Sequence, residues 1–391
     1  MGKMNINYDR GLSSLPEDAM FEIFLQLCVS DLVSLKLVCK SWHKIITSRI
    51  LAERHLQRSK DNIGIMFTPT RHFWDLKPSY LSFGDHVLDQ CYVIDKLYPN
   101  DDYKFLKYYE TLNSCDGLVL ALIRLNGDLE FDGRLLVFNP MMRWTKLLPI
   151  PPCGIGSSLY PDTKHIIYHA SMERYKLVWR RGEDGQCYLM EVDTGSQHQL
   201  TSSWRIIAPL HSTPSTEYAR ASVSSDGKLH WLMKKRDIEN KINLLTLDVA
   251  TEKLDEVDCC LPFAQTSNNP LKFFGSNGKF YHMRVTSCND FELWDLRDLN
   301  NHQPTWFKRH LYVCSQTLPS ISPLTGWVDF ICESKNGGKF IFMKRDTGTL
   351  VVYELNSGKC TSLDLDKGVG ANIYQPFLVH VNSLVSWRGR S

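Results

Sequence analysis

Apolar residues recur with two different periods along the chain, and the period changes near residue 60. In the first part, four apolar residues are spaced at i, i+3, i+4 and i+7, which places them on one face of a helix. They are Met20, Ile23, Phe24 and Leu27. A second run with helical spacing continues to about His55. We therefore predict two or three short helices over residues 11–58, preceded by a polar, disordered tail over residues 1–10.

From residue 63 onward, short runs of β-branched and aromatic residues alternate with Gly, Asn, Asp and Pro turns, a pattern typical of β-strands. The runs repeat as a unit of about 50 residues, close to the length of a four-stranded propeller blade. We predict a large all-β domain over residues 63–391, β-propeller-like with six to seven blades, closed by a strand within Phe377–Trp387. Two β-sandwich domains would also contain many short strands, but repetition of one unit favours the propeller.

The helical part is too short to bury a comfortable core alone, because small domains bury a low fraction of their surface. Part of its apolar face should therefore be covered by something else. A partner protein with helices would suit such a face. The alternative is a helical cap that packs on the β domain.

Charge and cysteine content narrow the class of partner. Lys and Arg number 45 against 43 Asp and Glu, for a net charge of +2, and this balance argues against a nucleic-acid partner. The 12 cysteines form no C-x-x-C pair, so we expect no zinc site and read them as free thiols in a reducing compartment. Apolar runs are far shorter than the ~20 residues of a membrane helix. We expect no membrane association and a cytoplasmic or nuclear location.

No motif for catalysis or cofactor binding occurs in the sequence. It contains no P-loop, no dinucleotide-binding glycine pattern, no G-x-S-x-G and no H-E-x-x-H. His165 and His169 are four apart, but on a predicted strand, where we interpret them as packing residues. We predict a protein that is not an enzyme, with no catalytic residue, no metal and no cofactor.

Residues 15–46 resemble an F-box. The family pattern of Leu-Pro, an apolar helix, Asp-Leu and Val-Cys-Lys-x-Trp is present, although Cys28-Val29 replaces a frequent Leu-Pro and Lys36 a frequent Arg. The resemblance implies that residues 11–58 bind the Skp-type adaptor of a cullin–RING ubiquitin ligase. The residues implied for this contact are Leu15, Pro16, Met20, Ile23, Leu27, Leu32, Leu35, Val38, Cys39 and Trp42.

The rest of the chain is similar to the β domains, some of them kelch-like, that follow the F-box in many plant proteins. The motifs Ser114-Cys115-Asp116-Gly117-Leu118 and Phe138-Asn139-Pro140 carry this resemblance. It implies the substrate-recognition subunit of a Skp–cullin–F-box E3 ligase, a non-catalytic role in which the propeller binds an unknown protein to be ubiquitinated for degradation.

Long polar segments follow the Leu-Pro elements of the repeat, and we expect them to form the rim of a binding surface, since loops on rigid scaffolds often carry recognition. Tyr160, Tyr218 and Arg220 are the predicted substrate anchors. Two other functions stay open. A propeller enzyme or small-molecule receptor would need titratable groups that converge on a central pocket. An F-box protein that acts outside the ligase, as a scaffold or inhibitor, would differ only in cullin recruitment.

Overall fold

The fold is taken from a computed structural model of the whole chain. It describes residues 15–60, 63–67, 79–82, 90–93, 106–125, 133–142, 144–152, 154, 162–169, 174–182, 184–191, 203–207, 217–235, 241–261, 272–276, 278–285, 291–300, 303–311, 328–334, 338–344, 349–364, 378–381 and 383–385. The predictions made for residues 1–10 and for Tyr160 lie outside these residues.

Four helices make up the N-terminal part: α1 (Glu17–Gln26), α2 (Val29–Leu35), α3 (Lys40–Ile46) and α4 (Arg49–Ser59). The predicted number of two or three was wrong because the second helical run is interrupted twice. One interruption is at Ser48, whose Oγ accepts a hydrogen bond from the backbone N–H of Leu51 at 3.3 Å and so caps α4.

The described strands form six antiparallel sheets of four strands each. The first sheet joins both ends of the β domain: β24 (Leu378–Val381), β1 (Ile63–Phe67), β2 (Ser79–Ser82) and β3 (Gln90–Val93). The next two are β4 (Leu106–Cys115), β5 (Leu118–Leu125), β6 (Arg134–Asn139) and β7 (Trp144–Leu148), then β8 (Thr163–His169), β9 (Arg174–Arg180), β10 (Cys187–Glu191) and β11 (Arg205–Ile207).

The other three sheets follow in chain order. They are β12 (Glu217–Ser225), β13 (Lys228–Lys235), β14 (Lys241–Asp248) and β15 (Lys253–Cys260); β16 (Lys272–Ser276), β17 (Lys279–Val285), β18 (Phe291–Arg297) and β19 (Thr305–Leu311); and β20 (Val328–Glu333), β21 (Lys339–Lys344), β22 (Thr349–Glu354) and β23 (Cys360–Asp364).

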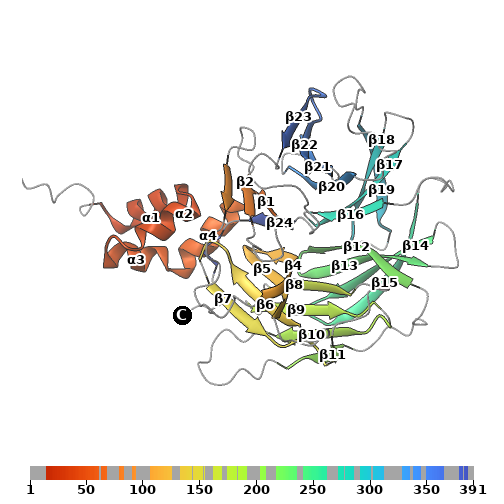
Figure 1. Ribbon diagram of the computed structural model, residues 1–391, viewed down its shortest axis with the longest axis horizontal. Helices are drawn as coiled ribbons and strands as arrows, with labels where there is room; N and C mark the ends of the chain where they lie inside the picture. Colours follow the sequence, from red (N-terminus) through yellow and green to blue (C-terminus); the bar gives the residue numbers. More distant parts are fainter. Residues whose placement is uncertain are drawn as a thin grey trace, which may run out of the picture.

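The sheets are arranged in a closed ring, with the helices projecting from one side next to β24, β1 and β7 (Figure 1). The strand at one edge of each sheet contacts its counterpart in the next sheet, in the order β24, β4, β8, β12, β16, β20 and back to β24. The predicted closing strand is confirmed, because β24 pairs with β1, with Val381 opposite Ile63 and Leu378 opposite Met66. The all-β domain is a propeller, and the two-sandwich alternative was wrong.

Central strands of the sheets are buried on both faces, because their side chains pack against a neighbouring sheet on each side. In β6, every residue after Arg134 is buried, and in β9 every residue after Arg174. One continuous apolar core lies between the β4–β7 and β8–β11 sheets and includes Leu120, Val137 and Trp179. Similar cores fill the spaces between later neighbours.

Two-residue Asp-Gly turns connect the first two strands in two of the sheets. Asp116 and Gly117 have φ of 52° and 85°, and Asp226 and Gly227 have φ of 50° and 75°. Positive φ at both positions is the type I′ geometry that matches the twist of antiparallel strands. The turn motifs in the sequence therefore mark real hairpins.

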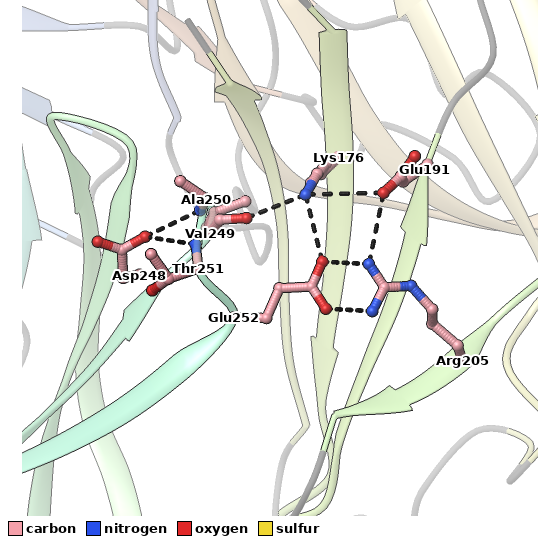
Figure 2. A network of polar contacts seen from close by, with 8 residues as sticks. All are labelled: Lys176, Glu191, Arg205, Asp248, Val249, Ala250, Thr251 and Glu252. Atoms are coloured by element: carbon pink, nitrogen blue, oxygen red, sulfur yellow. Dashed lines mark hydrogen bonds and ion pairs between the residues drawn. The ribbon is translucent and has the colours of Figure 1, made fainter. Parts of the chain in front are cut away.

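A polar network joins the β8–β11 sheet to the turn between β14 and β15 (Figure 2). The almost fully buried Lys176 of β9 donates through Nζ to the carbonyl of Val249 at 3.0 Å and forms ion pairs with Glu252 at 3.4 Å and Glu191 at 3.7 Å. Glu252 also pairs with both terminal nitrogens of Arg205 on β11. The hydrogen bonds from Arg205 lower the pKa of Glu252. The network therefore fixes one sheet against its neighbour.

Candidate functional site

The four helices enclose a small apolar core. The helices contribute its buried residues Met20, Phe24, Val29, Leu32, Ile45, Ile46 and Leu51. The Trp42 ring of α3 is half-buried and meets Phe24 of α1 edge to face, with ring centroids 5.4 Å apart. Arg54 of α4 lies over the Phe21 ring of α1, 5.5 Å from its centroid. These contacts fix the relative positions of the helices.

Several large apolar side chains of the helices and of the segments that join or precede them are exposed. The exposed fraction is 89% for Leu37, 59% for Val38 and 61% for Ile50, and Leu15 and Ile23 are also exposed. Single exposed apolar residues are common on protein surfaces, but five on a unit of four short helices are unusual. They define the candidate functional site, which we call the apolar bundle surface.

The connection between α2 and α3 holds the most exposed part of this surface. Backbone N–H groups of Leu37 and Val38 donate to the carbonyls of Ser34 and Leu35 at 3.2 and 3.1 Å, so the turn has a defined shape. Cys39 follows as the N-cap of α3, with its Sγ accepting from the N–H of Trp42 at 3.5 Å. The apolar side chains of Leu37 and Val38 are therefore presented on a backbone of defined shape, which lowers the entropy cost of ordering that backbone on binding.

The structure divides the predicted adaptor-contact residues into three groups. Leu15, Pro16, Ile23, Val38 and Cys39 are exposed, Leu27, Leu35 and Trp42 are half-buried, and Met20 and Leu32 are buried in the bundle core. Met20 and Leu32 therefore contribute to the bundle core in this conformation, and their direct contact with an adaptor stays a prediction. The apolar spacing that identified them marks the core face of a helix, which is a separate property from exposure.

Leu37 and Ile50 belong to the apolar bundle surface but are not among the predicted contact residues. Leu37 lies in the connection that follows α2, and Ile50 is the second residue of α4. Ile50 fits the helical run that continues to His55, which favours a core position, yet it is 61% exposed because a new helix begins at Arg49. Leu37 does not fit the spacing of that run, and this was the available signal for its exposure.

Two of the three predicted substrate anchors lie among the described residues. Tyr218 and Arg220 lie in β12, an edge strand of its sheet, whereas Tyr218 was expected in a connecting segment. The pairing of β12 with β13 shifts its register between Ala219 and Ala221, which puts Arg220 at a bulge. Tyr160 lies outside the described residues.

Buried histidines of the propeller serve packing between sheets. Nε2 of His165 on β8 lies 2.9 Å from Ser222 Oγ on β12, and Nδ1 of His380 on β24 lies 2.8 Å from Ser114 Oγ on β4. Burial lowers the pKa of His165 to about 4 and of His380 to about 3, so both are neutral at pH 7. In the part of the chain that the structure describes, no group of three or more His, Cys, Asp or Glu residues could hold a metal ion.

Two family models match this chain, one over the β part and one over the helical part. A family model described as the F-box associated beta propeller domain matches residues 74–387, and one described as the F-box domain matches residues 12–54. The chain therefore belongs to the family of proteins with an F-box-associated β-propeller domain.

Relatives named F-box proteins occur in Arabidopsis thaliana. F-box protein At3g08750 is 23% identical over 79% of this chain and 76% of its own length. Putative F-box/kelch-repeat protein At1g13200 is 26% identical over 61% of this chain and 59% of its own length. Among solved structures, one chain of a nidogen/laminin complex is 9% identical, with 82% of this chain and 99% of that chain covered and a TM-score of 0.43. Among the described helices, none is long and apolar enough to cross a membrane.

Proposed function

We propose that this protein is the substrate-recognition subunit of a Skp–cullin–F-box E3 ubiquitin ligase. In this proposal the F-box, residues 11–58, binds a Skp-type adaptor and through it a cullin–RING ligase. The β domain, residues 63–391, binds the protein to be ubiquitinated for degradation. The observation that carries the proposal is the apolar bundle surface, because it occurs on helices that match the F-box family model.

The physical case for an adaptor rests on exposed apolar area. Burying one exposed Leu, Ile or Val contributes up to ~1.5–3 kcal/mol. Leu37 and Val38 together could therefore supply several kcal/mol on binding, since both are more than half exposed and lie in an ordered turn. A helical partner with an apolar groove would complete the surface that the bundle leaves open.

The proposed role requires no catalytic residue in this chain. A substrate receptor acts by raising the effective concentration of its substrate next to the loaded conjugating enzyme, and a long-lived contact with each partner is sufficient. We infer a cytoplasmic or nuclear location, where ubiquitin ligases of this class would act on intracellular proteins. We further infer a kelch-type propeller in which each of the six sheets is one blade; their number and ring order support this count.

The test of adaptor binding is co-purification with a Skp-type adaptor and titration of the purified proteins. The variant L37D/V38D should weaken binding at least ~100-fold, because two apolar contacts are replaced by buried charges. The matched control is Ile206→Asp, which alters an exposed apolar residue of β11 in the propeller and should bind like the wild type. Circular dichroism checks that each variant keeps its fold.

Failure of the folded wild type to bind would refute the proposal. Adaptor binding without recruitment of the cullin would also contradict it, and would favour an F-box protein that acts as a scaffold or inhibitor outside the ligase.

The substrate side of the proposal keeps Tyr160, Tyr218 and Arg220 as anchors. Replacing both tyrosines with Ala should leave adaptor binding unchanged and reduce the set of proteins that accumulate ubiquitin when the ligase is reconstituted in an extract. Measuring those proteins by mass spectrometry checks the assignment. An unchanged set would show that the substrate contacts lie elsewhere.

A further inference from the structure

A C-terminal segment of the propeller contributes to the core of the F-box bundle. This segment, Ser383–Val385, follows the closing strand β24. Its Leu384 is only 4% exposed and belongs to the same apolar cluster as Phe24, Leu32 and Ile46 of the helices. The bundle core is therefore completed in part by the β domain, as in the alternative of a helical cap that the sequence left open.

The hairpin turn between β4 and β5 holds the C-terminal segment on one side. Ser383 donates through Oγ to the carbonyl of Asp116 at 2.7 Å. A Cβ added to Gly117 would lie 2.0 Å from that Oγ and 2.9 Å from the carbonyl oxygen of Val381. Only glycine permits so close an approach.

The equivalent turn in another sheet gives an internal comparison. Gly227 has nearly the same backbone conformation as Gly117, with φ of 75° against 85°. A Cβ added to Gly227 would have no heavy atom within 4 Å. The close contact at Gly117 therefore comes from the C-terminal segment and is not required by the turn.

Asn139 at the end of β6 holds the segment on the other side. This fully buried amide donates through Nδ2 to the carbonyls of Ser383 and Val385, at 3.1 and 2.7 Å. Its Oδ1 accepts from the backbone N–H groups of Met141 and Met142, at 2.9 and 3.1 Å. One side chain thus fixes both the C-terminal segment and the turn that follows β6.

Further contacts join the helices and the propeller at this place. Met141 and Met142 pack against the bundle core, and Nζ of Lys36 lies 3.5 Å from Sδ of Met142. Lys60, which follows α4, forms an ion pair with Asp116 at 3.0 Å. The β4–β5 turn and the turn after β6 therefore contact both the C-terminal segment and the helical part of the chain.

We infer that Leu384, held by Gly117 and Asn139, is a positioning residue that fixes the orientation of the F-box relative to the propeller. Domains of one chain move relative to each other unless an apolar interface prevents it. With the proposed function, on which this consequence rests, a fixed orientation would hold a bound substrate at one place relative to the ligase. Loss of Leu384 would spread the substrate over many orientations and lower its effective concentration.

The experiment measures the orientation directly in the full chain, with and without a bound Skp-type adaptor. Spin labels are introduced as unnatural amino acids at Lys44 on α3 and Thr251 between β14 and β15, both exposed. Pulsed electron paramagnetic resonance then gives the distribution of distances between them. The wild type should show one narrow distribution, and Leu384→Ala should widen it at least twofold.

Two further variants separate positioning from general stability. Leu384→Met, which preserves apolar volume, should restore the narrow distribution. Leu147→Ala removes an exposed leucine of β7 in the adjoining sheet and should leave the width unchanged. A folded Leu384→Ala protein with the wild-type width would overturn the inference. If Leu384→Ala does not fold, Met142→Ala decides in the same way: a wider distribution supports the inference and an unchanged width overturns it. Because the width is measured without the adaptor as well, failure of adaptor binding would refute only the proposed function.

Discussion

Removal of the Glu252 carboxylate should destabilise the propeller more than removal of the buried charge it neutralises. In the variant Glu252→Ala, the ammonium of Lys176 keeps the Val249 carbonyl at 3.0 Å and Glu191 at 3.7 Å, but loses its nearer carboxylate at 3.4 Å. Breaking a buried ion pair from one side costs ~3–5 kcal/mol. Because Glu191 remains within reach and Glu252 is partly exposed, we expect a loss of about 2–3 kcal/mol.

The opposite change should cost less. Lys176→Met removes the buried ammonium and keeps an apolar side chain of similar length, while Glu252 retains both nitrogens of Arg205. Replacing a buried charge with an apolar group is often close to neutral, so we expect about 0–1 kcal/mol. The double variant K176M/E252A should cost less than the two single variants added together, because the charge that Glu252 neutralises is then absent.

Urea unfolding of the full chain, followed by tryptophan fluorescence, measures these differences. Asp255→Ala is the matched control, since it removes an exposed carboxylate from β15, the strand that follows Glu252. It should change the free energy of unfolding by less than about 0.5 kcal/mol. The reasoning fails if Glu252→Ala behaves like this control, or if Lys176→Met is as destabilising as Glu252→Ala.

Two other predictions concern pH and backbone space. His165 and His380 have pKa values lowered to about 4 and about 3 from 6.5, so below pH 6.5 the unfolded chain binds protons that the folded chain does not. The free energy of unfolding is therefore highest above pH 6.5 and falls as the pH falls, by about 2 kcal/mol for each histidine between pH 7 and 5. Urea unfolding at both pH values should show a smaller fall in the H165Q/H380N variant than in the wild type. Gly117→Ala should lower the melting temperature more than Gly227→Ala, because only the first Cβ would collide with Ser383, at 2.0 Å; equal shifts in differential scanning calorimetry would contradict this.

The class of the fold could be predicted from the sequence because its signals are local. Helical spacing at Met20 and Phe24 marked the core face of α1, and both residues are buried. The Asp-Gly turns at Asp116 and Asp226 marked hairpins because positive φ at both turn residues suits these residue types. The closing strand could be predicted because a ring of repeated units must pair its two ends.

The contact surfaces could not be predicted in the same way, because exposure depends on tertiary packing. Leu32 and Val38 are both apolar residues of the F-box motif, yet Leu32 is fully buried and Val38 is 59% exposed. Tyr218 follows a polar segment that favours a loop, but it pairs with Lys234 in the β12–β13 ladder. In both cases the deciding contacts come from residues distant in sequence or from backbone pairing, which local composition does not encode.

The junction between the domains shows how one motif can serve two purposes. Asp116-Gly117 and Asp226-Gly227 make the same type of turn, so turn chemistry alone explains why each has glycine. Of these two glycines, only Gly117 also contacts the C-terminal segment, so a Cβ would collide with a neighbouring segment at Gly117 and not at Gly227. Asn139 adds a buried amide that satisfies two carbonyls and two N–H groups at the same place. A sequence repeat therefore identifies the sheet. The contacts that join this sheet to the F-box involve residues far apart in sequence, such as Leu384 and the helical core, and the repeat does not encode them.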